Sequence, residues 1–74
     1  MKLRPLPSKK IIGILRRLGF KKVRQRGSHV FFRHPDGRIT IVPIHKEEAI
    51  GRGLLQEIVK DVKLTKEEFF KYLD

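Results

Sequence analysis

The first third of the chain carries the apolar spacing of a helix. Apolar residues recur at three- and four-residue steps: Ile11, Ile14, Leu15 and Leu18. This spacing puts one apolar stripe on a helix, and Ser8 is a suitable residue for its N-cap. Gly19 suits the C′ position, where glycine takes a left-handed conformation without strain. We therefore predict a helix from about Ser8 to Leu18, after an irregular lead-in over residues 1–7.

Residues 28–34 change to the alternating pattern of a strand with one buried face. One face of this strand is mostly apolar and consists of Ser28, Val30 and Phe32. The other face carries an imidazole, an aromatic ring and a guanidinium: His29, Phe31 and Arg33. Such a row is unusual to expose to water unless something binds there, so this face is the candidate site.

One further strand is expected before this one in the chain and one after it. Residues 20–26 lack clean alternation and are predicted to form an edge strand. The turn formed by Pro35, Asp36 and Gly37 leads into residues 38–42, which are β-branched and alternate, so residues 28–42 should form a hairpin. Its register stays open, because both faces of residues 38–42 carry apolar side chains.

The C-terminal part returns to helical spacing. Residues 47–50 are compatible with one helical turn, and a clearer helix follows Gly53 with this stripe: Leu54, Leu55, Ile58, Val59 and Val62. Thr65 and Glu68 form the sequence of a capping box, which starts a last short helix whose apolar residues face inward. The order of elements predicts an α+β fold, with helices over one face of an antiparallel sheet.

The length of the chain limits what it can enclose. A chain of 74 residues forms one domain, over residues 1–74, and such a domain buries only roughly 60% of its unfolded surface. Chemistry should therefore take place on an open surface to which a large partner comes. The chain has no cysteine, which excludes disulfides and thiolate zinc sites. It lacks a membrane-length apolar run and a signal-peptide pattern, so we expect a soluble, cytoplasmic protein.

Positive charge is concentrated in the first part of the chain. Residues 1–46 contain 13 Lys and Arg and one acidic residue, Asp36, whereas residues 47–74 contain 5 basic and 7 acidic residues. The net charge of +10 therefore comes entirely from the part that includes the candidate site. An excess of this kind is typical of nucleic-acid binding, whereas a surface that is merely solubilising would intersperse the two signs.

Two features of the first helix disfavour it in isolation. Lys9 and Lys10 lie at the positive end of the helix dipole, which suggests that an anion lies nearby. Gly13 costs about 1 kcal/mol relative to alanine within a helix. This glycine suggests the close approach of another element, although packing alone could explain it.

A series of short motifs then resembles the HicA (YcfA-like) toxin family. The motifs are, in order, Leu18-Gly19-Phe20, Gly27-Ser28-His29 followed by Phe31 and Phe32, Ile41-Val42-Pro43-Ile44-His45, Ile50-Gly51-Arg52-Gly53-Leu54-Leu55, and Leu64-Thr65-Lys66-Glu67-Glu68-Phe69. The resemblance spans nearly the whole chain, and it is the order and spacing of the pieces that make it specific. It implies a fold similar to double-stranded-RNA-binding domains, activity as a ribosome-independent mRNA interferase, and a HicB-like antitoxin as partner. The family's catalytic histidine falls on His29.

The residues themselves give an independent reason to consider His29. The 2′-hydroxyl of RNA can attack the neighbouring phosphate if a base removes its proton, and histidine suits that task without a metal cofactor. Donors for the developing charge could come from Arg26, Arg33, or the backbone N–H of Gly27 or Ser28. A proton donor for the leaving group is not obvious, and His45 qualifies only if the fold brings it close.

Other readings remain open at this point. His29 could be an ordinary surface histidine, Phe31 could be buried rather than stack on a base, and His34 is expected to be a solvated strand-end residue. A zinc site from the three histidines is disfavoured, since it lacks thiolates and a close helical histidine pair. A non-catalytic RNA- or DNA-binding module is the main alternative. The expected RNA contacts are Lys21, Lys22, Arg24, Arg26, Gly27, Ser28, Phe31 and Arg33.

Overall fold

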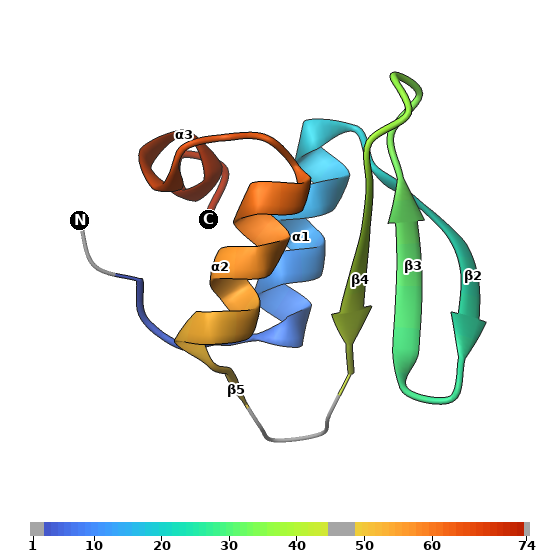
Figure 1. Ribbon diagram of the computed structural model, residues 1–74, viewed down its shortest axis with the longest axis horizontal. Helices are drawn as coiled ribbons and strands as arrows, with labels where there is room; N and C mark the ends of the chain where they lie inside the picture. The colour runs from blue at the N-terminus through green and yellow to red at the C-terminus, as the bar shows by residue number, and fades with distance from the viewer. Residues whose placement is uncertain (1–2, 45–48, 74) are drawn as a thin grey trace.

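The computed structural model describes residues 3–44 and 49–73. Its elements are β1 (Leu6–Pro7), α1 (Ser8–Leu18), β2 (Lys21–Arg26), β3 (His29–Arg33), β4 (Ile39–Pro43), β5 (Ala49–Ile50), α2 (Arg52–Asp61) and α3 (Lys66–Phe70). Strands β2, β3 and β4 form an antiparallel sheet in that order, and β1 pairs with β5 in a separate two-stranded sheet. Figure 1 shows α1 and α2 together on one face of the three-stranded sheet. The predicted α+β fold, similar to double-stranded-RNA-binding domains, is confirmed.

The core lies between this helix pair and one face of the sheet. The sheet contributes Val30, Phe32, Thr40 and Val42, all at most 2% exposed. The helices contribute residues of their apolar stripes: Ile11, Ile14, Leu15, Leu55, Ile58 and Val59. Full burial of such a side chain stabilises the fold by about 1.5–3 kcal/mol relative to leaving it exposed. The sheet is therefore held by one face, and within the described residues no helix covers the other face (Figure 1).

The bounds of α1 match the prediction, but its N-cap does not. Gly19 has φ 102°, its N–H donates to the Arg16 carbonyl, and the N–H of Phe20 donates to the Leu15 carbonyl (2.9 Å). These two bonds define a Schellman motif, which turns the chain into β2. At the other end the N-cap is Pro7 rather than Ser8, because β1 pairs with β5 and keeps the chain extended through Pro7.

The C-terminal elements differ from the prediction in two places. Helix α2 begins at Arg52, and Leu54 is 43% exposed instead of buried. Part of the expected helical turn over 47–50 is a strand, β5, and residues 47 and 48 lie outside the described part. The capping box of α3 is confirmed: the Glu68 N–H donates to Thr65 Oγ1 (3.1 Å), and the Thr65 N–H donates to Glu68 Oε1 (2.9 Å).

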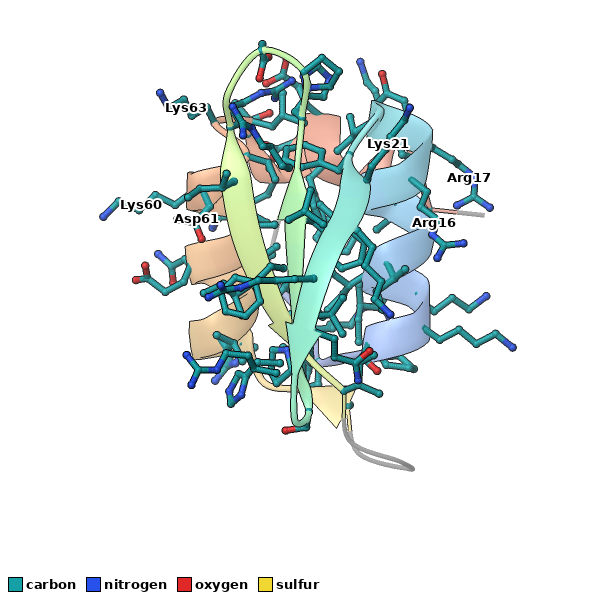
Figure 2. All side chains as sticks on the ribbon, turned by 90° about the vertical axis from the view of Figure 1, so that its right-hand side faces the viewer. Arg16, Arg17, Lys21, Lys60, Asp61 and Lys63 are labelled. Atoms are coloured by element: carbon teal, nitrogen blue, oxygen red, sulfur yellow. The ribbon has the colours of Figure 1, made fainter. Side chains whose placement is uncertain are left out.

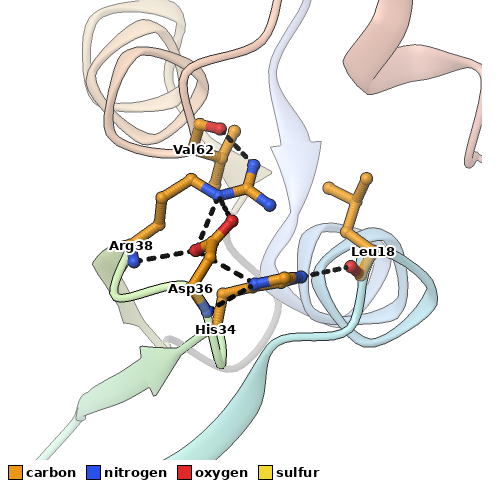
Figure 3. Close-up of polar contacts among 5 residues, drawn as sticks. All are labelled: Leu18, His34, Asp36, Arg38 and Val62. Carbon is orange, nitrogen blue, oxygen red and sulfur yellow. Dashed lines mark hydrogen bonds and ion pairs between the residues drawn. The ribbon is translucent and has the colours of Figure 1, made fainter.

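The β3–β4 turn is tied to the C-terminal ends of both long helices (Figure 3). His34 Nε2 donates to the Leu18 carbonyl of α1 (3.1 Å), and Arg38 Nη1 donates to the Val62 carbonyl after α2 (2.7 Å). Both carbonyls belong to the set that a helix end leaves without an intrahelical partner. The expectation that His34 is a solvated strand-end residue is therefore wrong: its ring is part-buried and packs edge-on against Phe20.

Asp36 holds Arg38 in place for this contact. Arg38 Nε donates to both carboxylate oxygens of Asp36, at 3.1 and 2.8 Å. The side-chain hydrogen bond from Arg38, supported by its backbone N–H, lowers the pKa of Asp36 from 3.8 to about 2. A carboxyl group whose pKa falls on folding stabilises the native state above its unfolded pKa, and this contribution disappears as the pH falls through the folded value.

We expect Asp36→Asn to be less stable than the wild-type chain at pH 5–7. The difference in unfolding free energy should shrink as the pH falls from about 4 to 2, because the wild-type carboxylate becomes protonated in that range. Denaturant titrations at a series of pH values measure it. Glu57→Gln is the control, since Glu57 is an exposed carboxylate with no hydrogen bond or ion pair in the described part. A difference that stays constant down to pH 2 would contradict the assigned role of Asp36.

Candidate active site on the open face of the sheet

The face of the sheet that points away from the helices carries the candidate site. Along β3, Val30 and Phe32 are buried while His29 and Arg33 are exposed and Phe31 is half-buried. This alternation confirms the predicted division of the strand into two faces. Figure 2 looks onto the open face, with the strands in front of the helices.

The edge strand β2 brings three cations to the same face. Partners across an antiparallel ladder point to the same side of the sheet. Lys21 lies opposite Arg33, Arg24 opposite Phe31, and Arg26 opposite His29. Each of the three residues on the site face of β3 therefore has a Lys or Arg beside it.

A β-bulge at Val23 makes this arrangement possible. The register shifts between Lys22 and Arg24, and Val23 is the unpaired extra residue, 58% exposed. Strict alternation from Lys21 would put Val23 on the open face and Arg24 on the helix side. The bulge adds one residue, as bulges do, and moves Arg24 onto the face of His29. This bulge explains why residues 20–26 lack a clean alternation of apolar and polar side chains.

Lys22 is separated from the other predicted contacts. It pairs with the buried Phe32, so its side chain leaves the sheet on the helix side, where its Nζ donates to Gln25 Oε1 (2.9 Å). Both side chains are exposed, because β2 is the edge of the sheet. The structure thus brings together seven of the eight predicted contact residues on the open face and the adjoining turn, and places Lys22 on the other side.

Phe31 lies on the same face as His29 and is half-buried. This placement is the one that stacking on a base requires, and full burial, the other expectation, is not observed. The guanidinium of Arg24 lies 4.5 Å from the centre of its ring, a cation–π contact. The ring is therefore already covered on one side by a planar cation. A base could stack on the guanidinium, or on the ring once Arg24 moves to a phosphate.

His29 occupies the end of β3 next to the β2–β3 turn. Gly27 in this turn has φ 56°, a left-handed conformation that favours glycine. The turn is fixed from the other side by the Ile44 N–H, which donates to the Ser28 carbonyl (2.6 Å). The imidazole itself is exposed and has no hydrogen-bond partner among residues 3–44 and 49–73. It is therefore accessible to a large substrate.

Negative charge is absent from the described part of this face. Between residues 3 and 44 the only carboxylate is Asp36, which is bound to Arg38 beyond the opposite end of β3. His34 also lies at that end, about 17 Å from His29 along an extended strand, so these two histidines cannot share a metal ion. The suggestion for His45 lies outside the described residues. Within the part of the chain that the structure describes, the charged residues on the face of His29 include Arg24, Arg26 and Arg33.

The sequence prediction missed an apolar part of the site. Ile41 pairs with Phe31, and Ile39 pairs with Arg33, so both isoleucines point to the open face, 42% and 64% exposed. The polar residue between them, Thr40, is buried and donates to Asp61 Oδ2 (3.1 Å). The register could not be derived from residues 38–42, because burying the isoleucines would have seemed equally favourable. An exposed apolar strip beside cations is typical of a surface that a partner covers.

Fold and site together describe a small basic α+β domain with a histidine on a cationic, uncovered sheet face. A comparison with family models matches residues 8–64, well over half of the 74-residue chain, to the HicA toxins of bacterial toxin–antitoxin systems. The chain belongs to this family. A search among curated proteins gave no match. Within the described residues, no helix is long and apolar enough to cross a membrane.

The two faces of β3 should respond differently to mutation. We expect His29→Ala to change the unfolding free energy by no more than about 0.5 kcal/mol, because the side chain is exposed and makes no hydrogen bond or ion pair with the described residues. Phe32→Ala, three residues along the same strand, should cost about 3–5 kcal/mol, because it leaves a cavity in the core. Urea denaturation of the two variants measures both. A large loss in His29→Ala would indicate a structural histidine instead of an accessible one.

Proposed function

We propose that this HicA-family toxin is a metal-independent endoribonuclease that cleaves mRNA, with His29 as the general acid/base. The observation that carries the proposal is the exposure of His29 on a face whose charged neighbours, among residues 3–44 and 49–73, are all cations. A polyanion that lies on this face brings its phosphates to the imidazole. The membership of the chain in a toxin family supports the same reading.

The proposed reaction needs only groups that this face and the RNA supply. Neutral His29 removes the proton of a 2′-hydroxyl, and the 2′-oxygen attacks the adjacent phosphorus. A bond forms between O2′ and phosphorus, and the bond from phosphorus to O5′ of the next nucleotide breaks. The products are a 2′,3′-cyclic phosphate and a 5′-hydroxyl, and no redox step or metal ion enters the balance.

Arg26 is the best-placed donor for the charge that develops on the phosphate. It lies directly across the ladder from His29, whereas Arg33 is four residues along the strand, about 13 Å away. A guanidinium can bind two phosphate oxygens at once. The backbone N–H groups of Gly27 and Ser28 are the other candidates, since they immediately precede His29. Arg33 is then assigned to a neighbouring phosphate.

The leaving oxygen also needs a proton. Water is the simplest source, since the open face leaves the site in contact with solvent. Protonated His29 is a second source, since it can donate its proton to O5′ as the bond from phosphorus to O5′ breaks. The remaining proposed RNA contacts on this face are Lys21, Arg24, Gly27, Ser28 and Phe31. Lys22 lies on the helix side of β2, so it can contact the RNA only from beyond the edge of the sheet.

A non-catalytic RNA- or DNA-binding module remains the second candidate, and one observation favours it. His29 has no orienting carboxylate or carbonyl in the described part of the chain, whereas catalytic histidines are commonly held by such a partner. In this alternative the same cations bind phosphates and His29 is only one more surface contact.

We expect His29→Ala to abolish cleavage of RNA in metal-free buffer while RNA affinity falls by less than about threefold. The imidazole supplies a proton-transfer step worth about 10²–10⁴ in rate, whereas binding depends on the cations around it. His34→Ala is the control and should still cleave. It is assayed at a temperature at which circular dichroism shows that it is folded. Cleavage by His29→Ala at the wild-type rate would exclude the proposed chemistry. Absence of cleavage in all three proteins would favour the binding module.

The antitoxin partner implied by the family is proposed to be HicB-like and to cover this same face, so that His29 is occluded or displaced. The exposed isoleucines on β4 give it an apolar strip, and the cations on β2 and β3 give it a charged strip alongside. We expect Ile41→Asp to weaken antitoxin binding at least tenfold by calorimetry, about 1.4 kcal/mol. Tyr72→Asp is a matched control, because Tyr72 is 41% exposed but follows α3 in the helical layer. Equal losses in both variants would contradict this docking mode.

A further inference from the structure

A groove outside the open face runs along α1. Its described lining is Ser8, Lys9, Ile12, Gly13, Arg16 and Ile44, and its volume is about 320 Å³. This is near the lower end of the roughly 300–1,000 Å³ typical of sites that hold small molecules. We refer to it as the α1 groove.

The floor of the α1 groove is apolar and is deepened by a missing side chain. Ile12 is half-buried and Ile44 is 37% exposed, so both offer apolar surface to a ligand. Between the turns of the helix, Gly13 leaves the floor open: a Cβ there would meet only the end of the Arg17 side chain, at 3.3 Å. No other element approaches Gly13 closely among the described residues. The glycine therefore shapes a surface, and helix packing does not account for it.

The rim of the α1 groove is positive. Lys9 and Arg16 are both exposed, and no carboxylate lies in the described lining or in the first turn of α1. Figure 2 shows Arg16 on the α1 flank of the molecule, beside the open face of the sheet. An apolar floor between two cations is complementary to a base flanked by phosphates.

One wall of the α1 groove is hydrogen-bonded to the residue that precedes His29. Ile44, on its wall, donates its N–H to the Ser28 carbonyl, and Ser28 directly precedes His29. The β2–β3 turn therefore lies between the wall of the groove at Ile44 and the exposed imidazole of His29. A strand bound at His29 can pass around this turn into the groove.

We propose that the α1 groove binds one nucleotide of the RNA strand that flanks the cleaved phosphate. Its base lies on Ile12 and Ile44 over Gly13, and its phosphates lie against Lys9 and Arg16. This inference rests on the proposed function, because it extends the path of the same substrate. It gives a role to two features that destabilise α1 by themselves: a lysine at the positive end of the dipole and a glycine in the helix interior.

The experiment measures the binding of a short single-stranded RNA to His29→Ala protein, in which the RNA stays intact. One variant fills the groove, Gly13→Leu, with Gly13→Ala as its control. The other removes the rim charges, Lys9→Gln with Arg16→Gln. Its control is Lys60→Gln with Lys63→Gln, which changes the net charge equally on the opposite flank (Figure 2). Circular dichroism checks folding, and leucine and alanine are both better helix formers than glycine.

Fluorescence anisotropy over a salt series should separate the two groove contributions. The loss of Lys9 and Arg16 should weaken binding about tenfold and make the slope of log K against log salt less steep by about 1.4, or 0.7 for each phosphate. Gly13→Leu should weaken binding by about tenfold without changing the slope, because it displaces a base and no ion. The Gly13→Ala and Lys60/Lys63 controls should stay within about twofold.

The inference is overturned if the groove variants bind RNA with the same affinity as their controls. A Gly13→Leu variant that binds RNA normally but loses the antitoxin would also overturn it, since a protein side chain would then be the occupant. These readouts do not depend on cleavage. If the wild-type chain fails to cleave but the groove variants lose affinity as expected, the proposed function fails, and the groove stands as an RNA-binding site that flanks no cleaved phosphate.

Discussion

β3 buries Val30 and Phe32 against the helices, and by the period of two this leaves His29, Phe31 and Arg33 facing solvent. The rest of the structure depends on this one-sided burial. A slip of one residue would expose the phenylalanine and valine and bury a histidine and an arginine, which have no partners inside. The core therefore determines which side chains are available for chemistry, even though none of the core residues takes part in it.

Two local devices convert this constraint into a site. The bulge at Val23 re-registers β2 so that Arg24 and Arg26 stand beside Phe31 and His29. The turn between β3 and β4 is bound to the carbonyl ends of the two long helices through His34 and Arg38, which fixes the sheet against the helical layer. The bulge determines which charged side chains lie beside His29, and the turn determines how the sheet is positioned on the helices. Neither touches the proposed reacting atoms.

Sequence reasoning succeeded where the signal is local. Gly19, the capping box at Thr65 and the alternation of β3 each depend on residues within a few positions of one another. It failed where partners are distant in the chain: the pairing of residues 6–7 with 49–50, and the contacts of His34 and Arg38 with carbonyls 16 and 24 residues away. The side of the sheet taken by Lys22 also escaped it, because a bulge is visible in the sequence only as broken alternation. The alternation of β3 and the family resemblance both indicated His29, and the charge pattern indicated the cations near it. Which of these cations share the face of His29 required the fold.

The central claim is that His29 directs the 2′-hydroxyl of RNA against its own phosphate. It is tested most directly by the chemical ends of the fragments released by the wild-type protein, identified by mass spectrometry of a short RNA. The predicted ends are a 2′,3′-cyclic phosphate, or the 3′-phosphate it hydrolyses to, and a 5′-hydroxyl, with no cleavage when the 2′-hydroxyl at the cut is replaced by hydrogen. Fragments with a 3′-hydroxyl and a 5′-phosphate, or cleavage of the 2′-deoxy substrate, would contradict it.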